Sequence, residues 1–122
     1  MDMSRLIETP LHRLAHGRTG DKGNRINISV IAYRAEFFPV IREQVTAERV
    51  AELFSHRRPT KVERYELPRL GALNFVIDDV LEGGVNDALN LDGHGKTNAF
   101  LVLSMPVWVP ETILQLREEI TA

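Results

Sequence analysis

Cysteine is absent from this chain of 122 residues. Disulfides, thiolate catalysis and cysteine-ligated zinc are therefore excluded, and a reducing cytoplasm is the compartment we expect. A basic excess is absent too, because 15 lysines and arginines stand against 17 acidic residues and the formal net charge is -2. DNA-binding domains usually carry a clear positive excess, so this balance argues against nucleic acid as a partner.

Long apolar segments are also missing. No run approaches the roughly 18 residues that cross a bilayer, and the segment from Met1 to Arg5 lacks the basic-then-apolar pattern of a signal peptide. Hydrophobic residues make up 43% of the chain and charged residues 26%. Since there is also no internal repeat, we expect one soluble domain over 1–122 and no membrane partner.

Familiar catalytic signatures do not occur. The tripeptide Gly95-Lys96-Thr97 resembles the end of a P-loop, but Asn90 stands where that motif needs a glycine, and a β-type run follows where it needs a helix. A hairpin turn is the simpler interpretation of this segment. No Gly-x-Ser-x-Gly elbow surrounds any of the serines, which are Ser4, Ser29, Ser55 and Ser104.

The histidines do not indicate a metal centre. His12 and His16 are four residues apart, a spacing that brings two ligands together on a helix, whereas we expect a strand here. No acidic partner stands at a recognised interval, so we expect neither a metal nor a cofactor. His16 lies close to Arg18 and could serve as a general base or hydrogen-bond donor. A partly exposed histidine at a strand end is the structural alternative.

A dense polar motif stands out against these absences. It combines glycines, cations, a carboxylate and an amide in the sequence Arg18-Thr19-Gly20-Asp21-Lys22-Gly23-Asn24. Glycine lets backbone N–H groups approach a ligand closely, and Arg18 and Lys22 suit a carboxylate or phosphate. Such a loop beside a strand is a common place for a site. The alternative is a charged hairpin turn in which Arg18, Asp21 and Lys22 fix one another.

The candidate site residues follow from this motif and from nearby amides. An amide near an apolar strand either contributes to a site or joins a buried structural hydrogen-bond network, an alternative that covers Asn24, Asn27 and Asn74. The candidates for acid–base work are His16, Asp21 and Lys22. The candidates for ligand binding are Arg18, Gly20, Lys22, Gly23, Asn24 and Asn74.

Hydrophobic periodicity predicts an antiparallel α+β domain. After a loose lead over 1–9, the expected strands are 11–16, 26–33, 61–67, 70–77 and 99–107, with either strand or helix over 86–91. The expected helices are 36–56 in two pieces, 79–84 and 110–120. Pro39 and Thr46 suit the beginnings of the two pieces, and Pro68 ends its strand or places it at an edge.

This order of strands and helices is that of a split β-α-β, or ferredoxin-like, fold with an N-terminal hairpin and an extra C-terminal helix. Without cysteine, no iron–sulfur cluster is expected.

Several segments resemble one known family. Residues 18–33, 64–77, 81–97 and the closing apolar strand are similar to the ferredoxin-like C-terminal domain of AtuA-like proteins, which are named for acyclic terpene utilisation. The resemblance covers about 12–107. The remaining 108–122 would be an extension that could provide a self-association or partner surface.

The family resemblance implies which residues matter and what the protein does. It points to the motif from Arg18 to Asn24, and also to Asn74 and Gly83-Gly84, while Thr19 stands where the family more often has serine. In the family this domain usually follows a larger N-terminal domain, and the family is linked to the breakdown of branched, terpenoid acyl-CoA compounds. The resemblance therefore implies a small subunit or accessory component that binds an anionic group, with any lyase or hydratase chemistry completed by a larger AtuA-like partner.

Two other functions remain open at this point. The chain could be a non-catalytic assembly module whose motif is structural. It could instead be a small independent lyase or hydratase that uses His16, Asp21 or Lys22 as acid–base groups. Ferredoxin-like sheets often leave one face to be covered, so we expect a homodimer in either case.

Overall fold

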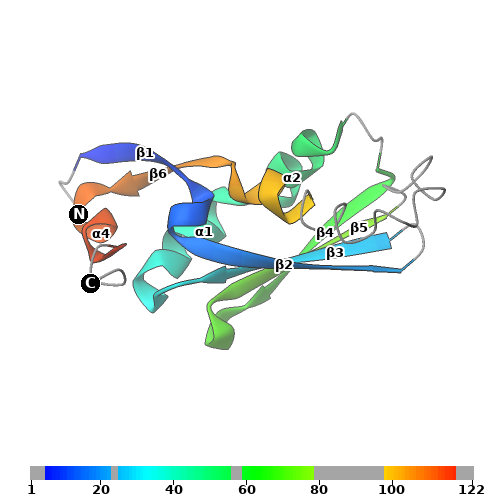
Figure 1. Cartoon of the computed structure of the whole chain (residues 1–122), viewed down its shortest axis with the longest axis horizontal. Helices are drawn as coiled ribbons and strands as arrows, with labels where there is room; N and C mark the ends of the chain where they lie inside the picture. The colour runs from blue at the N-terminus through cyan, green and yellow to red at the C-terminus, as the bar shows by residue number, and fades with distance from the viewer. Residues whose placement is uncertain (1–4, 23–24, 56–58, 79–97, 118–122) are drawn as a thin grey trace.

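The computed structural model describes residues 5–22, 25–55, 59–78 and 98–117, with only the backbone for residues 21 and 22. Within these ranges the chain forms a four-stranded antiparallel sheet of order β2-β3-β5-β4 and a two-stranded sheet of β1 and β6 (Figure 1). The strands are β1 (Leu6–Pro10), β2 (Ala15–Lys22), β3 (Arg25–Ala32), β4 (Lys61–Leu67), β5 (Ala72–Asp78) and β6 (Pro106–Pro110). This architecture confirms the predicted α+β class with an antiparallel sheet.

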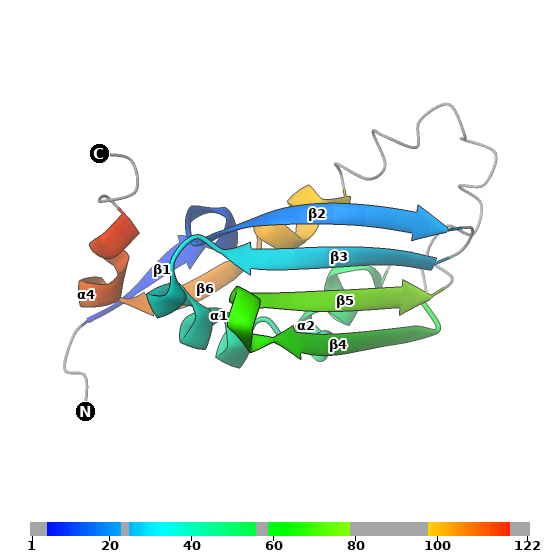
Figure 2. The same cartoon turned by 90° about the horizontal axis from the view of Figure 1, so that it is seen from below.

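The hydrophobic core lies between one face of the large sheet and the helices. Alternate side chains of the central strands β3 and β5 are fully buried on this face, as their period-2 pattern predicts. These side chains are Ile26, Ile28, Val30, Leu73, Phe75 and Ile77. The helices α1 (Phe38–Gln44) and α2 (Ala47–Leu53) lie on the same side and bury Ile41 and Val50 against them (Figure 1). The other face of the sheet carries no helix of the described residues, and Figure 2 looks onto it.

The two helical pieces begin where the sequence predicts. Pro39 lies in the first turn of α1, where its missing N–H costs no hydrogen bond. Thr46 is the N-cap of α2, and its hydroxyl oxygen accepts a hydrogen bond from the Arg49 backbone N–H at 3.1 Å. A short 3-10 helix, Ala35–Phe37, precedes α1. The predicted helical region of 36–56 is thus confirmed up to residue 53.

The N-terminal region differs from its prediction. Residues 6–10 are not a loose lead but the strand β1, which pairs with β6. The expected strand over 11–16 begins instead as a 3-10 helix, Leu11–Arg13, and only Ala15 and His16 lie in β2. The local sequence misled the prediction because β1 is defined by its partner, which lies about a hundred residues later in the chain.

The polar motif is a strand rather than a loop. Residues 15–22 pair with residues 25–32 throughout, from Ala15 opposite Ala32 to Lys22 opposite Arg25. Only Gly23 and Asn24 lie between the two paired ends, and they fall outside the described residues. The N-terminal hairpin is therefore confirmed, but the long binding loop expected over 18–24 is wrong.

The expected strand over 99–107 is also wrong. Residues 98–103 are helical, the Ser104 N–H donates to the Phe100 carbonyl at 2.9 Å, and extended structure begins only at Pro106. An unbroken apolar run of this length fits a buried strand or a buried helix equally well. Tertiary packing selects the helix, because Val102 and Met105 are buried in the core.

The remaining elements agree with expectation in part. Strands β4 and β5 match the predicted 61–67 and 70–77 closely, and β4 lies at the edge of the sheet. The C-terminal helix α4 (Glu111–Leu114) begins after Pro110, with residues 116 and 117 again helical. The predicted 79–84 helix, the 86–91 element and the turn near 92–97 lie outside the described residues.

Candidate functional site

The candidate site residues gather on the helix-free face of the large sheet, here called the open face. Antiparallel register places their side chains in rows that cross the strands. One row holds Arg18, Ser29, Asn74 and Tyr65, and a second holds His16, Ile31, Ala72 and Leu67. A third holds Gly20, Asn27, Val76 and Glu63. Residues that are far apart in sequence thus become neighbours.

Four of the sequence-derived candidates lie on this face. His16, Arg18 and Gly20 alternate along the edge strand β2, and Asn74 lies on β5. Arg18 is opposite Ser29, and Ser29 is opposite Asn74, so the three form one line across three strands. The structure therefore brings Arg18 and Asn74 into one neighbourhood, which supports treating them as members of a single surface.

The structure adds Ser29 to this line, and sequence reasoning missed it as a site residue. The Ser29 hydroxyl donates a hydrogen bond to Asn74 Oδ1 at 3.1 Å. This contact fixes the amide, whose Nδ2 makes no hydrogen bond to the residues that the structure describes. The sequence did indicate that Ser29 faces away from the core, because it alternates with the apolar Ile28 and Val30. It did not indicate that Ser29 contacts Asn74, which lies 45 positions later in the chain.

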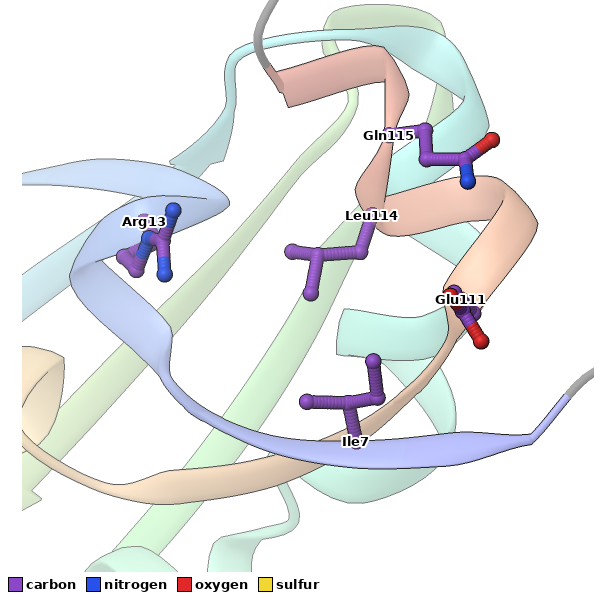
Figure 3. A pocket seen from close by; sticks show the side chains of 5 residues that line it. All are labelled: Ile7, Arg13, Glu111, Leu114 and Gln115. Atoms are coloured by element: carbon purple, nitrogen blue, oxygen red, sulfur yellow. The ribbon is translucent and has the colours of Figure 1, made fainter.

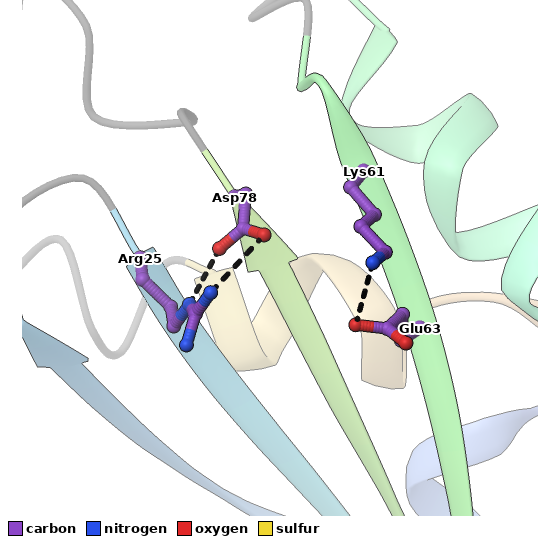
Figure 4. A network of polar contacts seen from close by, with 4 residues as sticks. All are labelled: Arg25, Lys61, Glu63 and Asp78. Carbon is purple, nitrogen blue, oxygen red and sulfur yellow. Dashed lines mark hydrogen bonds and ion pairs between the residues drawn. The ribbon is translucent and has the colours of Figure 1, made fainter.

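Arg18 is an uncompensated cation on the open face. Its side chain is exposed, and no carboxylate of the described residues lies within ion-pair distance. Arg25 and Lys61, the other cations described on this face, both have acidic partners (Figure 4). Arg18 is therefore the cation of the three that has free capacity for an external anion.

The Arg25–Asp78 pair closes one end of the sheet. Arg25 Nε and Nη2 donate to the two carboxylate oxygens of Asp78 at 2.5 and 3.4 Å. This hydrogen bonding raises the pKa of Arg25 and lowers the pKa of Asp78 from its ordinary value, and the nearby Lys61 charge adds to the lowering. Lys61 contacts Glu63 at 3.4 Å on the neighbouring strand (Figure 4). The Arg25–Asp78 pair thus joins β3 to β5, whereas Lys61 and Glu63 pair within β4.

His16 has an aromatic environment. Its ring stacks on Tyr33 with centroids 5.4 Å apart and an interplanar angle of 28°. The Arg117 guanidinium also lies over the Tyr33 ring, 5.9 Å from the ring centroid. The structure places neither a nucleophile nor a carboxylate in hydrogen-bond contact with His16 among the described residues. Its suggested role as an acid or base stays a prediction.

Gly20 leaves space for an amide. A Cβ at this position would lie 2.9 Å from Asn27 Oδ1, so the Asn27 side chain lies directly over the glycine. Gly17 differs, because a Cβ there would meet the Ser29 carbonyl oxygen at 3.2 Å and the Leu103 side chain at 3.4 Å. Gly17 and Gly20 thus allow close backbone and side-chain packing, and the approach of Gly20 to a ligand stays a prediction.

Part of the predicted motif cannot be placed. Asp21 and Lys22 belong to β2 by backbone pairing, opposite Ile26 and Arg25. Gly23 and Asn24, like Gly83 and Gly84, lie outside the described residues. The structure therefore leaves the roles of these residues as predictions.

The concave places described by the structure lie away from Arg18. One hollow of about 330 Å³ lies between β1 and α4, where Ile7 and Leu114 face its interior and Arg13 lies across from them (Figure 3). Another, of about 210 Å³, lies at the end of the sheet between Tyr33 and Leu70. Neither of these two hollows includes His16, Arg18 or Asn74 in its lining.

The described residues contain neither a cluster of metal-ligating side chains nor a helix that could span a membrane. No group of three or more histidine and acidic side chains among them is close enough to hold a metal ion. No helix in the same residues has both the length and the apolar character needed to cross a bilayer.

The fold and the open face define a class: an antiparallel α+β domain with helices on one side of its sheet. Comparison with known families makes this specific. The AtuA ferredoxin-like domain matches residues 9–108, and the chain belongs to this family. No curated protein and no solved structure matches the chain.

Proposed function

We propose that this protein is a small subunit or accessory component of an AtuA-type catabolic system that acts on branched or terpenoid acyl-CoA or carboxylate compounds. In this role it binds an anionic group on the open face, and Arg18 is the main contact. The observation that carries the proposal is the Arg18 guanidinium, which has no acidic partner among the described residues and lies in line with the Ser29–Asn74 pair. Family membership supports the catabolic setting.

The arrangement suits a carboxylate or phosphate group. Strands are spaced about 4.8 Å apart, so Arg18 and Asn74 lie on strands roughly 10 Å apart with Ser29 between them. An anion above Ser29 can accept hydrogen bonds from the Arg18 guanidinium and from the Asn74 Nδ2 group. Ser29 already donates to Asn74 Oδ1, so its hydroxyl proton is used by the amide and the donors offered to the anion are those of Arg18 and Asn74 Nδ2.

A larger partner is part of the proposal because Arg18 is exposed. Water would compete strongly for a single exposed Arg18, and a ligand on an open surface is bound weakly. A larger AtuA-like chain covering this face would exclude that water and would supply any lyase or hydratase groups. The small chain then contributes the anion contact, and the partner contributes the enclosure.

Ligand-induced thermal stabilisation tests the anion contact. Coenzyme A and isovalerate serve as probes of the two anion types, and the double variant Arg18→Ala/Lys22→Ala is compared with the parent. A ligand at 100 times its Kd stabilises by about 2.7 kcal/mol, which raises the Tm of a domain this size by several degrees. We expect the shift in the parent and its loss in the double variant.

The matched control is Arg69→Ala, which removes an exposed cation that lies outside this row. It should keep the full shift. Equal shifts in the parent and in the double variant would exclude the Arg18 site. An unfolded double variant would show that the motif is structural.

A non-catalytic assembly module is the second candidate function. It is favoured by the exposed apolar side chains at one end of the open face, including Tyr65 and Leu67. In this case the double variant would keep its fold and assembly, and neither probe would stabilise the parent. The same measurement of ligand-induced thermal stabilisation therefore distinguishes the two candidate functions.

A further inference from the structure

Large apolar side chains are concentrated at one end of the open face, beside the turn between β4 and β5. Seven large hydrophobic side chains are exposed among the described residues, and four of them belong to this end. They are Tyr33, Tyr65, Leu67 and Leu70, here called the apolar end, with exposed fractions of 44, 48, 41 and 69%. A contiguous exposed group of this kind marks an interaction surface more often than scattered single residues do.

The backbone beneath the apolar end is fixed by hydrogen bonds. The Ala32 N–H donates to the Gly71 carbonyl at 2.8 Å, and the Tyr33 N–H donates to the Leu14 carbonyl at 2.9 Å. Gly71 closes the turn with φ of 60°, and its N–H donates to the Pro68 carbonyl at 3.1 Å. The surface is therefore preorganised, which lowers the entropy cost of association.

The apolar end combines projecting side chains with a hollow. The hollow of about 210 Å³ runs between Tyr33 and Phe38 on one side and Pro68 and Leu70 on the other. Leu67 and Tyr65 project next to it from the edge strand β4. A two-fold axis brings the same patch of each subunit together, so a patch with both features can be complementary to itself.

The charges around the apolar end suit a second copy of the same chain. Arg34 contacts Glu36 at 3.3 Å, and on the helix side of the edge strand β4 Arg64 contacts Glu66 at 3.0 Å. Arg69 is the one cation of this rim with no acidic contact among the described residues. A nearly neutral rim does not repel its own copy, whereas a rim of one sign would select a partner of opposite charge.

The exposed area is compatible with a dimer. The four side chains together expose on the order of 350 Å², given the areas typical of Tyr and Leu side chains. This is close to half of the roughly 800 Å² that each partner buries in a standard interface. The walls of the hollow and the adjoining part of the open face would supply the remainder.

We propose that two copies of this chain associate through the apolar end in an isologous, two-fold contact. Leu70 and Leu67 form its centre, and the hollow beside Tyr33 receives side chains of the second copy. The proposal does not rest on the anion contact. The proposed anion contact is the row of Arg18, Ser29 and Asn74. Ser29 precedes Tyr33 by about 13 Å of strand, so this row lies toward the margin of the interface.

Sedimentation equilibrium of the full chain tests the proposal. The parent should sediment near twice its chain mass of 13.8 kDa at micromolar concentration. The variant Leu67→Asp/Leu70→Asp should sediment as a monomer, with its dimer Kd raised at least 100-fold, because burying two carboxylates in the contact is costly. Circular dichroism and a thermal melt verify that the variant is folded.

Phe100→Asp is the matched control. Phe100 is 67% exposed but belongs to the helical residues 98–103, which cover the opposite face of the sheet. This variant should remain a dimer. A parent that is monomeric up to about 100 µM, or a folded Leu67→Asp/Leu70→Asp variant that dimerises as tightly as the parent, overturns the proposal. Dissociation by Phe100→Asp instead assigns the interface to the other face and also overturns it.

A crosslinking measurement covers the case in which the double variant does not fold. The chain has no cysteine, so a single introduced thiol reports only on its own neighbourhood. Under mild oxidation Leu70→Cys should form a disulfide-linked dimer, and Phe100→Cys should not. Equal crosslinking of both, or of neither, contradicts the proposal. A monomeric parent whose stabilisation by anions still depends on Arg18 would remove the dimer and leave the proposed function standing.

Discussion

The side chain of Gln44 pairs with the backbone of Trp108 as a neighbouring strand would. Gln44 Nε2 donates to the Trp108 carbonyl at 2.6 Å, and the Trp108 N–H donates to Gln44 Oε1 at 2.7 Å. The amide thereby covers the outer edge of β6, and Arg49 adds a third contact to the Pro106 carbonyl at 2.8 Å. A residue at the end of α1 thus ties the small β1–β6 sheet to the core.

Gln44→Ala should lower the free energy of unfolding by about 1–2 kcal/mol, because both backbone groups of Trp108 lose their partner. Urea denaturation followed by circular dichroism measures this. The neighbouring variant Glu43→Ala removes an exposed side chain and should change stability by less than about 0.5 kcal/mol. Equal midpoints for both variants would show that water replaces the amide without loss.

Asp78→Asn should reduce the dependence of stability on acid pH. Hydrogen bonding by Arg25 lowers the pKa of Asp78 in the folded protein. A group of this kind stabilises the fold above its unfolded pKa, near 3.9, and the stabilisation is lost as pH falls through the lower folded pKa. The parent should therefore be more stable than the variant at pH 7, and the difference should shrink by pH 3. Urea titrations at pH 7, 5 and 3 measure it, and a constant difference would contradict the assignment.

Asn74→Asp should weaken anion binding more than Asn74→Ser does. A carboxylate at position 74 would lie in the same row as Arg18 and would compete with the ligand for that cation. We expect at least a tenfold increase in the Kd for the coenzyme A probe with Asp and a smaller increase with Ser. Isothermal titration at constant ionic strength gives both values. Similar values for the two variants would place the anion elsewhere.

Gly17→Ala should destabilise the fold by about 1–2 kcal/mol, whereas Gly20→Ala should be nearly neutral. The added methyl at position 17 meets the Ser29 backbone carbonyl at 3.2 Å, and a paired strand cannot easily move. At position 20 it meets only the end of the Asn27 side chain, which can rotate. Thermal melts of the two variants provide the comparison, and a larger loss at position 20 would reverse this interpretation.

The local sequence predicted those elements whose pattern is complete within a few residues. The alternation of Ile26, Ile28 and Val30 identified a half-buried strand, and Thr46 identified a helix start through its own hydroxyl. The candidate residues Arg18 and Asn74 were found by residue type alone. Their common surface was beyond the sequence, because it depends on strand register and on Ser29.

The errors share one physical origin. The run 99–103 is apolar throughout, so its periodicity does not separate helix from strand, and packing of Val102 into the core made the choice. Residues 6–10 have little strand signal of their own and become β1 by pairing with β6. The motif from Arg18 was interpreted as a loop because glycine and charge are common in turns, yet pairing with β3 extends the strand to Lys22.

The sequence by itself determined the composition class, the single core, the family resemblance and the residue types that can bind an anion. These properties depend on local pattern and on chemistry that each side chain carries wherever it lies. Tertiary structure alone decided that the polar motif is an edge strand, that Arg18, Ser29 and Asn74 form one row, and that the apolar end is exposed. Strand register and burial are set by contacts between distant segments, and no local pattern contains them.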